Sequence, residues 1–141
     1  MKLKLNITFG PDRRSPFDRE VAYGREDWWN KPLRLGSCYV QVLEGAAEVA
    51  RVELDDHGYI NPDYAGVPDL GPERLKIQYF EVAGDDKNRG VGTAAVRALE
   101  KRYPDRRLFV YSDADGFWGS LGWDRFEGER LVTLFIQPVR E

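Results

Sequence analysis

The segment from Leu75 to Thr93, LKIQYFEVAGDDKNRGVGT, constrains the fold of this chain more than any other part of it. It predicts a β-strand, a short polar loop, a Gly-x-Gly turn and the start of a helix. Such a turn brings successive backbone N–H groups to a helix N-terminus, where the helix dipole and the unpaired amides favour an anion. A side chain at Gly90 or Gly92 would hold the oxygens of a ligand away from the backbone. The segment therefore predicts a phosphate-binding site.

The remaining sequence predicts further strands and helices by its hydrophobic spacing. We expect strands at 2–9, 38–43, 47–54, 75–82, 108–112 and 131–138, helices at 90–102 and 113–121, and at least partly helical structure at 20–29. The strands at 38–43 and 47–54 form a hairpin, and residues 55–73 form a long loop without periodicity of their own. The apolar last strand offers an edge through which a homodimer is possible.

One ligand that fits the phosphate site is a dinucleotide. The residues from Gly90 to Ala95 satisfy the G-x-G-x-x-A pattern, and Asp113 lies roughly 20 positions past the glycines, where a Rossmann unit binds ribose. Two features oppose this interpretation. The residues from Gly84 to Arg89 separate the strand from Gly90, whereas the Rossmann turn follows its strand directly. The sequence before Leu75 also predicts an antiparallel meander rather than alternating strands and helices.

Two motifs favour another ligand. Lys87-Asn88-Arg89-Gly90-Val91-Gly92 resembles motif A of the GNAT (N-acetyltransferase) superfamily, with Val82 at the position of that family's strand end. Ala114 to Trp123, ADGFWGSLGW, resembles a second GNAT segment. The two occur in the family's order, separated by a helix and a strand. The resemblance covers Leu75 to about Phe126 well, and the rest of the chain only by its pattern of elements.

The resemblance implies an α/β fold, with a mixed, largely antiparallel central sheet flanked by helices, in a single acyl-CoA N-acyltransferase domain over residues 1–141. It implies acetyl-CoA as co-substrate, with the pyrophosphate on the amides of Arg89 to Thr93 and the pantetheine arm beside Val82 and near Phe117. The expected coenzyme-binding residues are Val82, Lys87, Asn88, Arg89, Gly90, Val91, Gly92, Thr93, Phe117 and Trp118.

Acetyl transfer to an amine requires a group that takes a proton. An amine with a pKa near 10 is almost wholly protonated at pH 7 and has to lose a proton before it attacks a thioester. We predict Glu81 as this base, because it precedes Val82 on the strand where the sheet should open toward the thioester. A surface carboxylate on the other face of the strand is the alternative for Glu81.

The departing thiolate can also be helped by an acid. The GNAT family usually supplies a Tyr from its second motif, but this chain has Trp118 there, and an indole N–H does not give up its proton at a useful pH. We predict Ser112 as the replacement, and Tyr111 and Tyr79 are further candidates. A thiolate with a pKa near 8.5 can also leave unaided.

Composition limits the partners and the compartment. The net charge is −3 without a block of like charge, which argues against nucleic-acid binding. No apolar run approaches the roughly 18 residues of a membrane span, and the N-terminus does not resemble a signal peptide. A single cysteine, Cys38, fits a reducing cytoplasm, and a single histidine, His57, argues against a metal site. The adjacent Trp28 and Trp29 either line a pocket for an amine acceptor or pack in the core.

The sequence therefore predicts a cytoplasmic acetyltransferase that moves an acetyl group from acetyl-CoA to a primary amine of a small molecule or protein. The alternative is a GNAT-fold module that binds an acyl-CoA without turning it over, and Trp118 is the residue that favours it.

Overall fold

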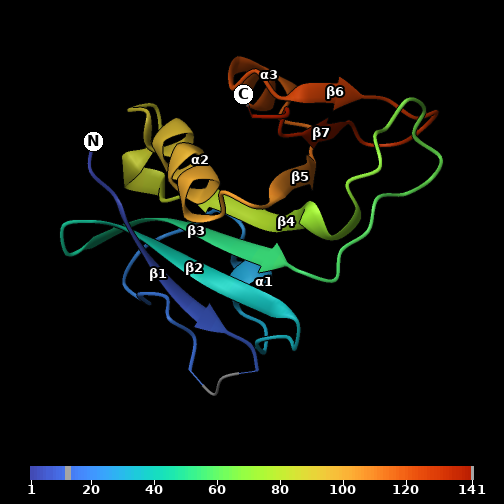
Figure 1. Ribbon diagram of the computed structural model, residues 1–141. Coiled ribbons are helices and arrows are strands. Elements are labelled where there is room, and N and C mark those ends of the chain that lie inside the picture. The colour runs from blue at the N-terminus through green and yellow to red at the C-terminus, as the bar shows by residue number, and fades with distance from the viewer. Residues whose placement is uncertain (12–13, 141) are drawn as a thin grey trace.

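A seven-stranded sheet of order β1-β2-β3-β4-β5-β7-β6 organises the computed structural model, which describes residues 1–11 and 14–140 (Figure 1). Its strands are β1 (Lys4–Phe9), β2 (Ser37–Glu44), β3 (Ala47–Asp55), β4 (Arg74–Val82), β5 (Arg107–Tyr111), β6 (Asp124–Phe126) and β7 (Leu134–Ile136). The helices are α1 (Glu26–Trp29), α2 (Val91–Arg102) and α3 (Asp115–Ser120), with short 3₁₀ turns at Gly71–Glu73 and Gly84–Asp86.

Neighbouring strands of this sheet run antiparallel, with β4 and β5 as the one parallel pair among the described residues. The helix α2 forms the crossover between these two strands. The predicted fold class, α/β on a mixed and largely antiparallel sheet, is confirmed. A Rossmann unit requires a sheet of parallel strands, so the dinucleotide interpretation does not fit this topology.

The helix α2 covers one face of the sheet with apolar side chains. Val91, Ala95 and Leu99 lie four residues apart on one face of the helix and are buried, as their spacing predicts. They pack against the aliphatic side chains of β2, β3 and β4 that point to this face, among them Val40, Val52, Leu54, Leu75 and Ile77. The single cysteine, Cys38, is buried in the same cluster.

Two β-bulges change which side chains share a face. Between β2 and β3, Val42 pairs with Ala50 while Leu43 pairs with Glu48, so Val49 is an extra residue in β3. Between β3 and β4, Glu53 pairs with Tyr79 while Leu54 pairs with Ile77, so Gln78 is an extra residue in β4. An extra residue shifts the alternation of a strand by one. As a result, residues three apart, which would otherwise lie on opposite faces, come to lie on the same face.

The other face of this part of the sheet is covered by the segment from Arg14 to Arg34, of which only Glu26–Trp29 is α-helical. The prediction that 20–29 is at least partly helical is confirmed, with the helix limited to the last four of these residues. Polar groups of the sheet hold the segment instead. The first bulge puts Glu48 and Arg51 on this face, where the carboxylate of Glu48 accepts hydrogen bonds from the amide of Asp18 (2.8 Å) and the hydroxyl of Tyr23 (3.0 Å).

The C-terminal part of the sheet differs from the prediction. The strand expected over 131–138 forms only at Leu134–Ile136, and a short strand that the sequence did not predict, β6, lies outside it. Since β7 pairs with both β5 and β6, and its three residues are buried, it is not an edge on which a second copy can add. The prediction of a dimer edge at the last strand was wrong on this point.

The long loop that follows β3 reaches across the C-terminal strands on the right of Figure 1. Its residues Tyr64 and Leu70 pack with Phe109, Leu134 and Ile136 in a separate apolar cluster.

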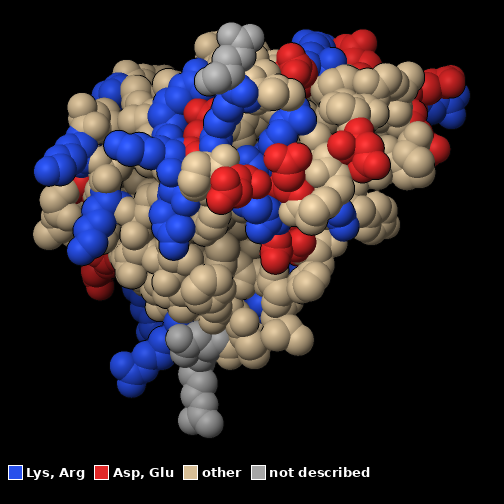
Figure 2. Space-filling model, in the orientation of Figure 1, with Lys and Arg blue, Asp and Glu red and all other residues tan. Residues whose placement is uncertain are grey.

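In Figure 2, Lys and Arg gather mainly on the left of the face shown, and Asp and Glu over its middle and right. None of the helices in the described part of the chain has the length and apolar character needed to span a membrane.

Candidate functional site

The strands β4 and β5 diverge after a short parallel contact. Their pairing is limited to Arg74–Lys76 with Arg107–Phe109, after which β4 stays paired with β3 and β5 pairs with β7. The gap is a groove of about 500 Å³ whose walls come from β4, β5 and the loop after it, α2 and α3. Its lining residues include Gln78, Tyr79, Phe80, Val82, Gly92, Val110, Tyr111, Ser112, Phe117, Trp118 and, from α1, Trp28.

Aromatic side chains form one wall of the groove. Phe80 lies in edge-to-face contact with Phe117 and with Trp118, at 5.9 Å between ring centroids in both cases. Gly92 packs directly against this wall, because a Cβ on it would lie 3.0 Å from Phe117 Cε1 and 3.6 Å from Val82 Cγ2. Glycine at position 92 therefore allows the start of α2 to approach the aromatic wall closely.

The start of α2 lies beside the same groove. Gly90 precedes the helix with a φ of +84°, and Asn88 has a φ of +63°, both in the left-handed region that glycine tolerates best. A Cβ on Gly90 would meet no neighbouring atom, so the backbone conformation, not a lack of space, is the reason for glycine there. The amides in the first turn of a helix have no intrahelical acceptor and can bind an anion.

The side chain of Arg89 is engaged with carboxylates. Its guanidinium contacts Glu44, in the β2–β3 hairpin, and Asp86, at 2.7 Å in each case, and these hydrogen bonds raise the pKa of Arg89. The side chain of Arg89 is therefore committed to fixing the loop, and only its backbone amide is offered to a ligand. Lys87 and Thr93 are exposed.

The predicted residues fall into two groups in the structure. Val82, Gly92, Ser112, Phe117 and Trp118 line the groove together. Lys87, Asn88, Arg89, Gly90, Val91 and Thr93 belong to the loop and first turn of α2 beside it. Val91 differs from the rest of this second group, since its side chain is buried in the core under α2 and its backbone alone can contact a ligand.

Glu81 does not line the groove. Its carboxylate accepts hydrogen bonds from the backbone amides of Gly24 (2.8 Å) and Arg25 (3.1 Å) and from the indole N–H of Trp29 (2.9 Å). The bulge at Gln78 points Glu81 to the face that carries α1, away from Phe80 and Val82. In this position the carboxylate fastens the α1 segment to β4. The role of Glu81 as a base stays a prediction.

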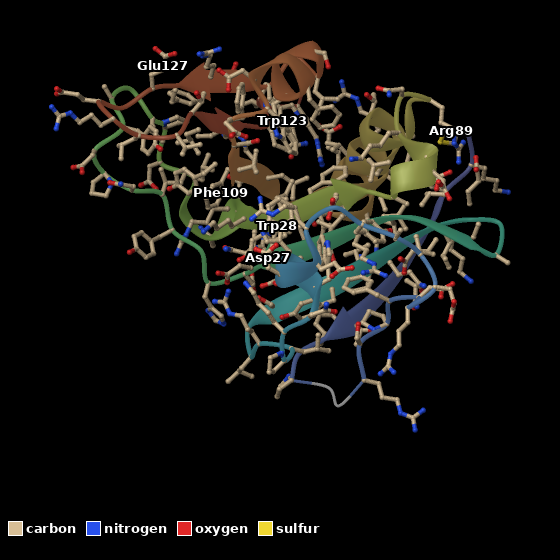
Figure 3. All side chains as sticks on the ribbon, turned by 180° about the vertical axis from the view of Figure 1, so that it is seen from behind. Asp27, Trp28, Arg89, Phe109, Trp123 and Glu127 are labelled. Carbon is tan, nitrogen blue, oxygen red and sulfur yellow. The ribbon has the colours of Figure 1, made fainter. Side chains whose placement is uncertain are left out.

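The two adjacent tryptophans have different environments. Trp29 is buried in the core, as one of the two sequence interpretations has it, whereas Trp28 is half-buried and lines the groove. The amine acceptor in the other interpretation stays a prediction. Trp28 stacks on Tyr79 with 4.8 Å between ring centroids, and the guanidinium of Arg25 lies 4.3 Å from the centroid of Trp28. Figure 3 shows Trp28 over the middle of the sheet, far from Arg89 at the start of α2.

Lys31 is the residue at this site that the sequence analysis missed. Its ammonium group donates a hydrogen bond of 2.9 Å to the hydroxyl of Tyr79, 48 positions away in the chain. No local pattern marks a pair at such a separation. The bulge at Gln78, in contrast, can be seen in the sequence. The apolar residues Leu75, Ile77, Phe80 and Val82 alternate strictly except between Ile77 and Phe80, which are three positions apart.

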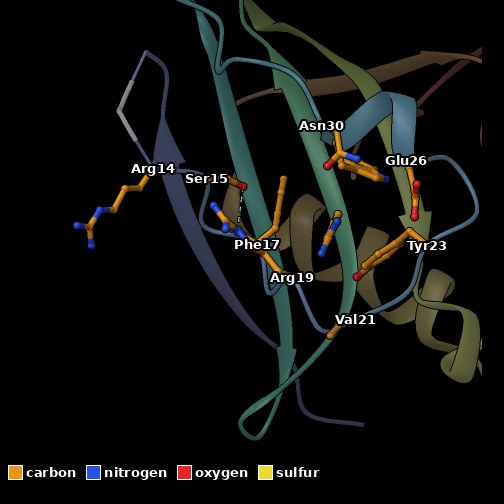
Figure 4. Close-up of a pocket in the computed structure, with 10 residues that line it drawn as sticks. Arg14, Ser15, Phe17, Arg19, Val21, Tyr23, Glu26 and Asn30 are labelled. Atoms are coloured by element: carbon orange, nitrogen blue, oxygen red, sulfur yellow. Dashed lines mark hydrogen bonds between the residues drawn. The ribbon is translucent and has the colours of Figure 1, made fainter.

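A second hollow, of about 720 Å³, lies under the segment 14–30 on the α1 face (Figure 4). The buried Arg51 in its wall contacts Glu48 at 2.8 Å and the carbonyl oxygen of Asp18 at 2.6 Å, between the rings of Phe17 and Tyr23. Arg14 points away from it in Figure 4. Because Arg51 already has its partners, this hollow offers no buried polar group to a ligand. Residues 1–11 and 14–140 contain no group of three or more potential metal ligands.

Several solved acetyltransferases have a similar structure. A GNAT family acetyltransferase from Elizabethkingia anophelis with acetyl-CoA bound matches with a TM-score of 0.56 at 9% identity, over 97% of this chain and 98% of that one. The ribosomal-protein-S18-alanine N-acetyltransferase from Escherichia coli matches with a TM-score of 0.53 at 11% identity, over 99% and 97%. An acetyltransferase from Thermus thermophilus matches with a TM-score of 0.56 at 16% identity, over 73% of this chain and 64% of that one, just under two thirds of its length.

Two of these likenesses cover nearly the whole chain at low sequence identity and therefore establish the fold. No protein-family model and no curated protein sequence matches the chain. The chain has the GNAT fold, and the resemblance stated from its two motifs is confirmed at the level of structure.

Proposed function

We propose that this chain, a protein of GNAT fold, transfers an acetyl group from acetyl-CoA to a primary amine. The groove between β4 and β5 carries the proposal, because it joins a helix N-terminus suited to phosphate with an apolar channel between diverging strands. The acetyl-CoA bound to the Elizabethkingia acetyltransferase supports the choice of coenzyme.

The residues of the groove fit the parts of acetyl-CoA in order. The amides of the first turn of α2 would bind the pyrophosphate. The edge of β4 beyond Lys76, which is unpaired on the β5 side, offers backbone groups to an extended amide-bearing arm, as an added strand would be bound. Phe80, Val82 and Phe117 offer apolar contact along that arm. Acetyl-CoA would supply an activated acyl thioester.

The acceptor would reach the thioester from the face that carries α1. Trp28 and Tyr79 line the groove from this side, and Arg25 and Lys31 lie against their rings. A primary amine has to lose a proton to react, and Glu81 and Ser112 stay our predicted catalytic residues until they are tested. The acceptor's identity is open to a screen of small amines and peptides.

Binding of an acyl-CoA without turnover is the second candidate function. Trp118 favours it, because the indole occupies the position where a proton-donating Tyr is expected, is 4% exposed and packs on Trp123 with 4.9 Å between ring centroids. Such a protein would keep the groove and the helix N-terminus and would lack transfer.

The test has two stages. Thermal unfolding is followed with acetyl-CoA, free CoA and NAD(H) in parallel; a ligand at about 100 times its dissociation constant adds about 2.7 kcal/mol, several degrees for a domain of this size. Thiol release from acetyl-CoA is then measured with a panel of amines. Stabilisation by the CoA ligands with thiol release supports the transferase, stabilisation alone supports the binding module, and stabilisation by NAD(H) alone contradicts both.

A matched pair of variants ties binding to the groove. Gly92→Val places side-chain atoms against Phe117, and we expect the stabilisation by acetyl-CoA to be lost. Gly119→Ala is the control, since a Cβ at Gly119 in α3 meets no neighbouring atom, and it should leave the stabilisation unchanged. Equal stabilisation of the two variants would place the coenzyme elsewhere.

A further inference from the structure

Three hydroxyl groups line the groove: those of Tyr79, Tyr111 and Ser112. The indole at Trp118 has no proton to give at neutral pH. Among the residues that line the groove, these three are the hydroxyl-bearing candidates for the proton donor to the departing thiolate. The hydrogen bonds that each hydroxyl already makes separate the three.

The hydroxyl of Tyr111 has partners on both sides. It accepts a hydrogen bond of 2.8 Å from the amide of Asn61 and donates one of 3.3 Å to the carbonyl oxygen of Tyr59. Burial also raises the pKa of Tyr111. Its proton is thus committed to the long loop, and Tyr111 acts there to hold that loop against β5.

The hydroxyl of Ser112 accepts a hydrogen bond of 3.1 Å from the amide of Ala114, at the start of α3. It keeps a proton that can be donated in a hydrogen bond. An aliphatic hydroxyl does not ionise in the physiological range, however, whereas a phenol ionises near pH 10. Ser112 can orient a group in the groove, but it is a poor source of a transferable proton.

The hydroxyl of Tyr79 accepts a hydrogen bond from a cation, and its own proton is free to be donated. The ammonium of Lys31 donates to it at 2.9 Å, and no residue of the described chain accepts the proton of Tyr79. The hydrogen bond from Lys31, opposed by burial and aided by Gln78, lowers the pKa of Tyr79. The phenolate that remains after proton donation would face a positive charge.

The neighbourhood of Tyr79 fixes the ring and leaves Lys31 as its closest charge. Trp28 stacks on the ring at an interplanar angle of 21°, and Trp29 meets it edge-on. The charged side chains on the elements around it include Arg25, Glu26, Asp27 and Lys31 from the α1 segment, Glu53 from β3, Lys76 and Glu81 from β4, and Asp113 after β5. Lys31 forms no ion pair with a described carboxylate, so its charge is directed at Tyr79.

We propose that Tyr79 is the catalytic residue that protonates the departing thiolate, and that Lys31 is the positioning residue that orients Tyr79 and stabilises its phenolate. This inference rests on the proposed acetyl transfer. It assigns the donor's part to a residue of β4 instead of the Trp118 position, and it explains how this groove can work with a tryptophan there.

Acetyl transfer with Tyr79 as the acid needs no further reactant. The neutral amine nitrogen forms a bond to the thioester carbonyl carbon, and the carbon–sulfur bond breaks with its electron pair on sulfur. The phenolic proton of Tyr79 moves to sulfur and yields the free thiol. The proton that the amine nitrogen gives up as it becomes an amide returns through water to the Tyr79 phenolate. Amine and thioester become amide and thiol without any other reactant.

The test compares Tyr79→Phe with the wild type in thiol release from acetyl-CoA. The variant keeps the ring that stacks on Trp28, so we expect it to fold and to show the same stabilisation by acetyl-CoA. Loss of a general acid should slow thiol release about 100-fold. Tyr59→Phe, which removes an exposed phenol outside the groove, is the matched control and should release thiol at the wild-type rate.

A second measurement does not depend on turnover. The ionisation of Tyr79 is followed by ultraviolet difference between the wild type and Tyr79→Phe, and Lys31→Met should move that midpoint to higher pH. A wild-type rate in Tyr79→Phe, or an unmoved midpoint in Lys31→Met, overturns the inference while acetyl transfer stands. A wild type that binds acetyl-CoA and releases no thiol, or does not bind it, overturns acetyl transfer and this inference together.

Discussion

The two faces of the central sheet are covered by different chemistry. The face under α2 is lined mainly by aliphatic side chains, with Val40, Val52, Leu54 and Leu99 at 0% exposure. The face under α1 also buries its side chains, but these include Glu48, Arg51 and Glu53, each at most 7% exposed. One face is closed by a regular helix and the other by an irregular segment held through hydrogen bonds.

The difference separates stability from specificity. Aliphatic contacts are non-directional and fix the sheet and helix that build the groove between β4 and β5. The polar contacts of the α1 face have strict geometry and place Trp28, Tyr79 and Lys31 at the α1 side of the groove. Removing an atom from either face should therefore have different consequences, and four substitutions test this.

The largest effect is expected from Glu48→Ala on the polar face. The change leaves the buried guanidinium of Arg51 without its ion pair and removes the acceptor for Tyr23 and Gln41. Breaking one partner of a buried pair destabilises a protein by about 3–5 kcal/mol. Urea unfolding monitored by tryptophan fluorescence measures it. The double variant Glu48→Leu with Arg51→Met should recover much of the loss; a loss equal to that of Glu48→Ala would contradict a buried-charge origin.

A comparable but smaller effect is expected from Leu99→Ala on the aliphatic face. Leu99 is fully buried in α2, and such a truncation leaves a cavity that lowers the free energy of unfolding by about 3 kcal/mol. The volume-conserving Leu99→Met should lower it by less than about 1.5 kcal/mol. The binding of acetyl-CoA to the folded fraction should not change in either variant. A change in affinity would show that this face is coupled to the groove more tightly than its contacts suggest.

The third substitution, Glu81→Gln, tests whether a polar contact affects the rate of acetyl transfer more than the stability of the fold. We predict that acetyl transfer falls at least about tenfold while coenzyme affinity stays intact, since a base or a positioned α1 segment is needed for transfer only. Steady-state kinetics against pH separate the two roles. A base lost from the mechanism lowers kcat and removes a titration from the profile, whereas a displaced Trp28 raises KM for the amine. An unchanged rate would exclude Glu81 from catalysis.

The smallest effect concerns pH and Glu53. Burial raises the pKa of Glu53, although the hydroxyl of Ser37 and the guanidinium of Arg34 oppose this. A carboxyl group whose pKa is raised on folding stabilises the fold fully at a pH below its ordinary pKa of 4.5. This stabilisation is lost as the pH rises through the raised pKa. Glu53→Gln should therefore gain stability relative to the wild type as the pH rises from about 4 to about 8, measured by urea unfolding. A difference that is constant with pH would show that Glu53 is not the titrating group.

Much of the aliphatic face and of the groove wall formed by the start of α2 could be predicted from sequence. The helix α2 begins within one residue of its predicted start because Gly90 and Gly92, the spacing of Val91, Ala95 and Leu99, and Pro104 are all local signals. The hairpin of β2 and β3 was predicted for the same reason, since alternation and a Gly-containing turn lie within a few residues of each other.

The polar face could not be predicted in this way. The α1 segment is short in helical residues because the carboxylates of Glu48 and Glu81, distant in sequence, satisfy its amides and tyrosine instead of helical carbonyl groups. The length of the last strand could not be predicted either. The apolar run at 131–138 predicted a longer strand, but only Leu134–Ile136 finds partners on both sides.

The sequence by itself determined the fold class, the crossover helix and the Gly-x-Gly turn at its start, because each depends on hydrophobic period, glycine and proline over a short stretch of chain. Tertiary structure decided where the bulges at Val49 and Gln78 form, since bulges arise from pairing between strands, although the broken alternation of β4 leaves a trace of the second one in the sequence. It also decided that Lys31 meets Tyr79. Contacts of that kind follow from strand register and packing, and neither composition nor local spacing contains them.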